Sequence, residues 1–168
     1  MLYMSFMVPL IDSVYGTLET AIGSDISTEA MTEFITMKAQ ELKSTIVVIE
    51  RKTGYLVATS DPSVRLYRMI NDTYAERNLA KENKNRLMQE LINYSRGTFG
   101  GRQFTSVQDS EGIYHGSFRF KSEIYFVNVG ALEDQYGADW IILQAVPRSF
   151  FFKDFNKSIG IMIGVTVA

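Results

Sequence analysis

The segment at residues 114–120 alternates strictly between two kinds of side chain, and this period of two can bury only one side of an extended strand. The buried side would carry the aromatic and small residues Tyr114, Gly116, Phe118 and Phe120. Two longer apolar runs follow at 124–132 and 140–146, separated by the polar residues 133–137, and Pro147 closes the second run. The pattern predicts a three-stranded antiparallel meander in the second half of the chain.

Two more strands are predicted before this meander. Residues 45–49 form a β-branched run with apolar side chains on both faces, as a strand at the centre of a sheet requires. The turn at 51–54 can use Gly54 for a positive φ angle, and residues 55–59 return as the partner strand. We therefore expect an α+β fold, with a five-stranded antiparallel sheet and flanking helices on one face.

Helical patterns surround the first two strands. Ser27 is suited to cap the N-terminus of a helix that runs to about Leu42. Residues 63–97 are expected to hold two helical pieces, the second at about 82–94. The first residues show no helical pattern. Apolar stretches at 3–10 and 17–22 flank a turn and predict a two-stranded ribbon. Since such a ribbon is marginal alone, we expect it to belong to a larger domain.

The end of the chain predicts a membrane segment. Residues 158–168 carry no charged side chain, and a helix of that length would cross about half of a bilayer core of roughly 30 Å. The residues before it combine aromatic and cationic side chains, as at a lipid headgroup boundary: Arg148, Phe150, Phe151, Phe152, Lys153, Phe155 and Lys157. The alternative is a buried terminal helix or strand of a soluble domain.

Gly160 and Gly164 have the small-xxx-small spacing of helix pairs and suggest a homodimer.

Composition excludes several functions. The net charge is −2 and no basic aromatic stripe or phosphate loop occurs, so nucleic acid is not an expected partner. The sequence has no Cys, which excludes thiolate chemistry and disulfides, and it has one His, His115, which excludes a His-rich metal site. No nucleophile elbow or paired-carboxylate pattern stands out, and we expect neither catalysis by this chain nor a cofactor or metal. Sequons at Asn71, Asn93 and Asn156 favour an exterior-facing domain.

Several motifs, in their order along the chain, resemble the double Cache sensor domains of transmembrane receptors. The motifs are Val8-Pro9, Ile11-Asp12, Gly16, Asp25-Ile26-Ser27, Val48-Ile49-Glu50, the run from Thr53 to Asp61, and the closing run from Asp139 to Ser149. The resemblance implies a PAS-like sheet in which residues 1–27 are the last strands of a membrane-distal module and 28–43 the connecting helix. Residues 44–155 would form the membrane-proximal module, and 156–168 would start the second membrane helix. Most of the distal module, which usually holds the ligand in this family, has no counterpart in the sequence.

In PAS-like sensors the ligand lies between the sheet and the segment that follows the second strand. This places the candidate ligand-binding residues at Asp61, Arg65, Tyr67, Arg68 and Tyr74, with Phe118, Phe120 and Tyr125 opposite. Arg and Tyr side chains suit a small carboxylate or an amino acid. The alternative is a solvated helix face over an ordinary aromatic core.

The resemblance implies an extracellular sensor at the plasma membrane, which relays ligand-induced change to the membrane helix. Its output domain, a cyclase, a histidine kinase or a methyl-accepting coil, would follow residue 168. A second interpretation is an accessory ectodomain without a ligand, as in channel subunits, and a third is a soluble profilin-like adaptor. A pocket lined by Arg and Tyr would favour sensing, whereas a pocket filled by Phe would favour the accessory role.

Overall fold

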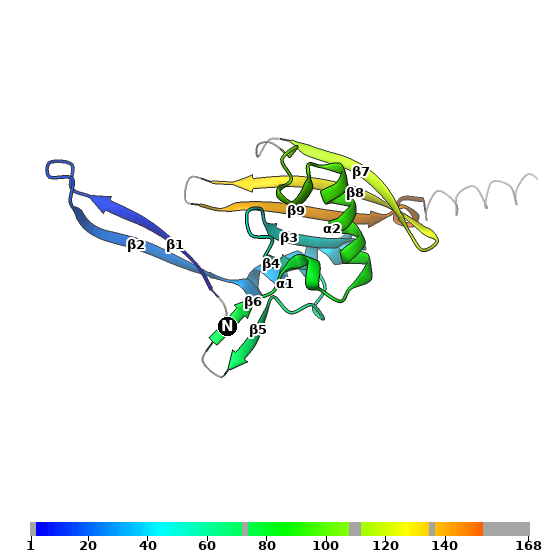
Figure 1. Cartoon of the computed structure of the whole chain (residues 1–168), viewed down its shortest axis with the longest axis horizontal. Coiled ribbons are helices and arrows are strands. Elements are labelled where there is room, and N and C mark those ends of the chain that lie inside the picture. The colour runs from blue at the N-terminus through cyan, green and yellow to red at the C-terminus, as the bar shows by residue number, and fades with distance from the viewer. Residues whose placement is uncertain (1–2, 72–73, 108–111, 135–136, 153–168) are drawn as a thin grey trace, which may run out of the picture.

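A computed structural model describes residues 3–71, 74–107, 112–134 and 137–152 of the chain (Figure 1). The elements, in chain order, are β1 (Tyr3–Ile11), β2 (Leu18–Ser27), α1 (Thr28–Glu41), β3 (Thr45–Glu50), β4 (Leu56–Thr59), β5 (Tyr67–Asn71), β6 (Tyr74–Arg77), η1 (Ala80–Glu82), α2 (Arg86–Thr98), η2 (Gly101–Gln103), β7 (Ile113–Phe120), β8 (Glu123–Glu133) and β9 (Asp139–Pro147). The fold is α+β, and its main sheet has five antiparallel strands, as predicted.

The five strands follow the order β4-β3-β9-β8-β7. The last strand, β9, therefore lies at the centre of the sheet, between β3 and β8. Alternate residues of the β7 strand are half-buried and the others are exposed, as its period of two predicts. The turn between β3 and β4 places Gly54 at a φ of 78°, which is the left-handed conformation expected there.

Helix α2 covers one face of the sheet and completes the main core. Its buried residues Met88, Leu91 and Ile92 pack with side chains of β3, β8 and β9. Asn85 caps the helix by accepting a hydrogen bond from the Met88 backbone N–H at 3.0 Å. The core is closed by Phe104, which is fully buried just after η2.

Helix α1 packs on the opposite face, so the prediction of helices on one face was wrong. Its residues Met31 and Ile35 join a smaller apolar cluster with Val48 of β3 and Val57 of β4. The reason is visible in β3, whose apolar residues on both faces need cover on both sides. Ser27 caps α1 as predicted, and its side chain accepts from the Ala30 N–H at 3.0 Å.

Residues 67–71 and 74–77 pair as the antiparallel strands β5 and β6, where the sequence predicted a helical piece. Two interactions that a helical reading overlooks stabilise the hairpin. Asn71 accepts a hydrogen bond from the Tyr74 backbone N–H at 2.7 Å, and Arg68 pairs across the strands with Glu76. The second predicted helix exists but begins later, at Arg86 and not near Glu82.

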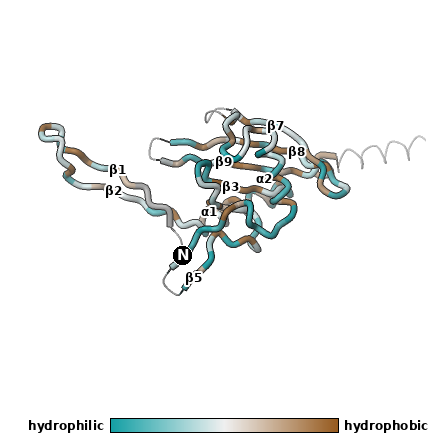
Figure 2. Tube along the Cα trace, viewed as in Figure 1, coloured by the Kyte–Doolittle hydropathy of each residue, from teal (hydrophilic) through white to brown (hydrophobic). Residues whose placement is uncertain are grey.

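The ribbon β1–β2 projects away from the five-stranded sheet (Figure 1). Brown, hydrophobic segments alternate with pale and teal ones along it (Figure 2). Its exposed apolar residues are Met7, Val8, Leu10, Ile11, Val14, Tyr15, Leu18, Ile22 and Ile26. Both strands match the prediction, although β2 continues directly to the cap of α1.

The last strand delivers the chain to a helical turn that begins at Arg148. Trp140 is only partly buried, because it stands at the start of β9 beside the exposed Leu132 of β8. No helix within the described ranges is long and apolar enough to cross a membrane. The predicted membrane segment at 156–168, with Gly160 and Gly164, lies outside the described residues.

Candidate functional site

Three of the predicted ligand-binding residues line one hollow of about 630 Å³. Asp61, Arg65 and Arg68 contribute from the chain after β4, and the segment 78–85 forms the other wall. The lining residues are Leu56, Asp61, Ser63, Val64, Arg65, Arg68, Asn78, Glu82, Asn83, Lys84 and Asn85. The structure therefore brings these three predicted residues together, at the point where the chain leaves the second strand of the sheet.

Asp61 joins the end of β4 to the start of α2. One carboxylate oxygen accepts from the Ser63 backbone N–H at 2.8 Å and from the Ser63 hydroxyl at 2.6 Å. The other oxygen accepts from the side-chain amide of Asn85, the capping residue of α2. Both carboxylate oxygens therefore accept hydrogen bonds within the fold. Asp61 connects β4 to α2 and has a structural role more than a ligand-binding one.

The hydrogen bonds of the Asp61 carboxylate make a pH-dependent contribution to the stability of the fold. Burial of the carboxyl opposes its ionisation, but the hydrogen bonds from Ser63 and Asn85 outweigh burial and lower the pKa of Asp61 from its usual value of 3.8. A group with a lowered folded-state pKa stabilises the fold above its unfolded pKa, and this stabilisation is lost as the pH falls through the folded-state value.

We expect Asp61→Asn to unfold more easily than the parent at pH 7 and to lose less stability between pH 5 and pH 2. Urea unfolding at several pH values measures both differences. The matched control is Asp25→Asn, at an exposed position whose carboxyl makes no hydrogen bond to other described residues. Parallel pH profiles of the Asp61→Asn variant and the parent would contradict the assignment.

The two arginines of the hollow differ in availability. The Arg68 guanidinium donates to Glu76 Oε2 from Nε at 2.8 Å and from a terminal nitrogen at 2.5 Å. The hydrogen bond with Glu76 raises the pKa of Arg68. The Arg68 charge is therefore paired within the β5–β6 hairpin. Arg65 is exposed and makes no ion pair with any described residue. Arg65 is therefore the arginine of this hollow that can meet a ligand.

Arg65 also borders a second hollow of about 540 Å³ between α1 and the segment 62–69, which we call the α1 groove. It is lined by Glu29, Thr32, Glu33, Pro62, Val64, Arg65, Leu66, Tyr67 and Met69. Tyr67, predicted as a ligand residue, lies here and not in the hollow of Asp61. The groove brings one cation, two glutamates and an apolar wall together.

Thr32 adds an unusual feature to the α1 groove. Its hydroxyl oxygen is buried and has no hydrogen-bond partner among the described residues. A buried hydroxyl without a partner costs free energy, so Thr32 is a local cost of packing α1 against this segment. The sequence prediction missed Glu29, Thr32 and Glu33, because they enter the groove through the packing of α1 against a distant segment.

The remaining predicted residues lie elsewhere. Tyr74 is exposed on β6 and lines neither hollow. Tyr125 stacks on Phe118 with ring centroids 5.6 Å apart, and Phe118 stacks in turn on Tyr94 of α2 at 5.5 Å. Burial, with a smaller effect of the Glu123 charge, raises the pKa of Tyr125. This aromatic ladder and Phe120 belong to the β7–β8 part of the sheet, so their placement opposite Arg65 was wrong.

Two predicted glycosylation positions are on the surface. Asn71 ends β5 and Asn93 lies on α2, and both residues are exposed. The third sequon residue, Asn156, lies outside the described residues.

His115 lies on the polar side of β7, where its Nδ1 is 2.9 Å from the Asn128 side-chain oxygen. No three His, Asp or Glu side chains come together as a metal site in the part of the chain that the structure describes. These described residues supply no arrangement that points to catalysis.

Comparison of the sequence with protein-family models finds no matching family, and comparison with curated proteins finds no matching relative.

Proposed function

We propose that this chain is a ligand-sensing region of a plasma-membrane receptor, facing the extracellular side and related to the double Cache domains that its motifs resemble. The observation that carries the proposal is the α1 groove, whose lining includes Arg65, which has no ion pair within the described residues, together with Glu29, Glu33 and an apolar wall. The order of elements also supports it: a ribbon and a helix precede a five-stranded antiparallel sheet.

The groove has the chemistry to bind a free amino acid. The Arg65 guanidinium suits the α-carboxylate, and the carboxylates of Glu29 and Glu33 suit the ammonium group. Leu66, Tyr67 and Met69 offer apolar contact to a side chain. A ligand with both charges and an apolar part therefore uses every wall of the groove, whereas a simple carboxylate would leave the glutamates without a partner.

A structural path leads from the groove to the last strand. Helix α1 forms one wall of the groove, and its residues Met31 and Ile35 belong to the same apolar cluster as Trp140 and Ile142 of β9. Because β9 is the central strand and leads towards the predicted membrane segment, a shift of α1 would act on the element that leaves the domain. Such a relay needs a bias of only about 1–3 kcal/mol between two arrangements.

The ribbon β1–β2 fits the role of part of a membrane-distal module. Its apolar residues, such as Met7, Ile11 and Ile22, are exposed, and a two-stranded ribbon is marginal without further cover. We propose that residues 1–27 pack in the distal module and that α1 connects it to residues 44–155. The membrane helix at 156–168 remains part of this proposal.

A thermal-shift screen of amino acids on the 168-residue chain tests the proposed function. A ligand at about 100 times its dissociation constant adds about 2.7 kcal/mol of stability, which corresponds to roughly 5–10 °C for a chain of this size. Arg65→Ala should abolish the shift, while Arg119→Ala, which removes an exposed arginine from β7, should keep it. If no amino acid stabilises the chain, or if Arg65→Ala shifts as the parent does, the sensing proposal fails.

One observation favours the accessory ectodomain as the second candidate. The space between α2 and the sheet is filled by buried residues, among them Phe104, Leu91 and Ile92, so a ligand has no room between those layers. A negative screen would leave the accessory role as the better explanation. A positive screen that depends on Arg65 would exclude it.

A further inference from the structure

Five basic residues converge on a third hollow of about 430 Å³, at the opposite end of β3 and β4 from Asp61. They come from separate parts of the chain: Arg51 and Lys52 from the β3–β4 turn, Lys81 from η1, Arg96 from α2 and Arg102 from η2. The other lining residues are Thr53, Gly54, Leu79, Gly100, Gln103 and Thr105. No carboxylate is among the lining residues, so we call this feature the basic hollow.

Most of these charges have no counter-ion within the described structure. Arg51 pairs with Asp139 at 2.7 Å and donates to the Val107 carbonyl oxygen at 2.7 Å. Lys52, Lys81, Arg96 and Arg102 form no ion pair with any described residue. The chain has a net charge of −2, so four unpaired cations around one hollow make this region strongly positive against a negative whole.

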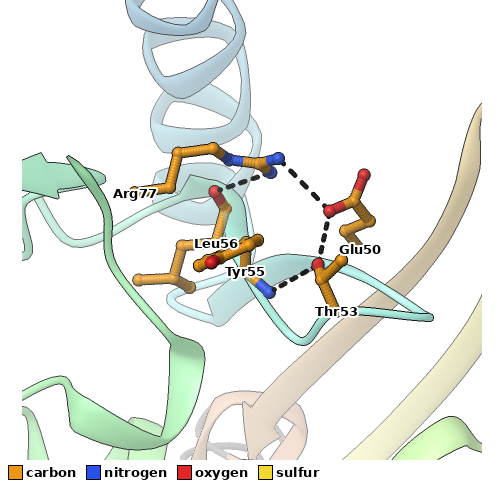
Figure 3. A network of polar contacts seen from close by, with 5 residues as sticks. All are labelled: Glu50, Thr53, Tyr55, Leu56 and Arg77. Carbon is orange, nitrogen blue, oxygen red and sulfur yellow. Dashed lines mark hydrogen bonds and ion pairs between the residues drawn. The ribbon is translucent and has the colours of Figure 1, made fainter. Parts of the chain in front are cut away.

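The acid nearest to the turn is already engaged. Glu50 Oε2 accepts from an Arg77 guanidinium nitrogen at 3.2 Å and from the Thr53 hydroxyl (Figure 3). Arg77 also donates to the Leu56 carbonyl oxygen at 3.5 Å and lies over the Tyr55 ring, 4.9 Å from its centroid (Figure 3). This network ties β6 to the β3–β4 turn and holds the wall of the hollow, but it leaves no free carboxylate there.

Two guanidinium nitrogens of the hollow are buried without a hydrogen-bond partner in the described structure, the Nε of Arg96 and one terminal nitrogen of Arg51. The Arg96 guanidinium is packed close to the turn, because a Cβ on Gly54 would be 3.3 Å from its terminal nitrogen. Burial, and then the like charge of Arg102, lowers the pKa of Arg96. The hollow therefore gathers partly desolvated, mutually repelling cations, and an anion beside them would reduce that repulsion.

We propose that the basic hollow is a binding site for a small, multiply charged oxyanion. Guanidinium groups bind phosphate and carboxylate oxygens in pairs of hydrogen bonds, and several fixed cations favour a ligand with two or more negative charges. The concave shape and the volume suit a small molecule and not an extended polyanion. The site is separate from the α1 groove, so it goes beyond the proposed amino-acid sensing and stands without it.

Isothermal titration calorimetry of the 168-residue chain with pyrophosphate and with citrate tests this site. The two probes distinguish a phosphate ligand from a polycarboxylate ligand. We expect saturable binding that weakens with added salt. Binding of pyrophosphate alone assigns a phosphate compound, and binding of citrate alone assigns a polycarboxylate. Glycine, the control for the α1 groove, should not compete.

The variants assign any binding to the hollow. Lys81→Gln with Arg102→Gln changes two exposed side chains, so the fold should persist. This pair should weaken binding about tenfold or more, and Arg96→Gln should do the same by removing the buried donor. Arg119→Gln and Arg65→Ala should bind as the parent does. The proposal is overturned if neither probe binds, or if the Lys81/Arg102 variant binds as tightly as the parent.

Discussion

Replacing Phe104 with alanine is expected to lower the free energy of unfolding by about 3–5 kcal/mol. Phe104 is fully buried and belongs to the main core with Leu91 of α2 and Ile141 of β9. Its removal would leave a cavity between the helix and the sheet, and the rigid strands cannot collapse to fill it. For a chain of this size, the loss corresponds to a fall in the melting temperature of roughly 6–20 °C.

Thermal unfolding followed by circular dichroism measures this effect. The matched control is Phe34→Ala, which removes the same side chain from an exposed position on α1. That control should stay within about 0.5 kcal/mol of the parent. If both variants melted alike, α2 would not pack on the sheet through Phe104 and the main core would be wrongly assigned.

Gly100→Ala should destabilise the protein by about 2–6 kcal/mol, as the combined cost of backbone strain and overpacking. Gly100 has a φ of 95°, and an added Cβ would lie 2.4 Å from the Thr105 hydroxyl oxygen and 2.5 Å from the Ser106 backbone nitrogen. Since the nearest groups include backbone, the clash cannot be relieved by rotating one side chain. The loop from η2 to Val107 would have to move.

Gly97→Ala is the control, because it adds the same methyl group three residues earlier. Gly97 lies within α2 and a Cβ there meets no atom within 4 Å, so alanine should stabilise the helix by about 0.5–1 kcal/mol. Urea unfolding should therefore separate the two variants in opposite directions from the parent. Equal stability of the two variants would refute the tight loop geometry at Gly100.

The sequence predicted the strands of the main sheet well, because their signals are local. The period of two in β7, the β-branched run in β3 and the turn at Gly54 each depend on neighbouring residues. The side of the sheet that α1 covers was mispredicted, although β3 is apolar on both faces. The hairpin β5–β6 was missed because its two stabilising interactions, from Asn71 to the Tyr74 N–H and from Arg68 to Glu76, form only once the strands are paired.

The candidate site was predictable only in part. Asp61, Arg65 and Arg68 follow one another closely in the sequence, so their shared hollow follows from the chain path after β4. The sequence assigned Tyr74 and Tyr125 to the wrong place, because no pattern of neighbouring residues shows how distant helices and strands pack against one another. The same limit hid Glu29 and Glu33 in the α1 groove. It also hid the basic hollow, whose cations come from the β3–β4 turn, η1, α2 and η2.

The emission of Trp140 tests whether a ligand in the α1 groove acts on β9. Trp140 is the only tryptophan of the chain and shares an apolar cluster with α1 residues Met31 and Ile35. The 168-residue chain is titrated with each amino acid except tryptophan and excited where only tryptophan absorbs. We expect a saturable change in emission that Arg65→Ala abolishes and Arg119→Ala retains. An amino acid that stabilises the chain through Arg65 but leaves the emission of Trp140 unchanged would contradict it.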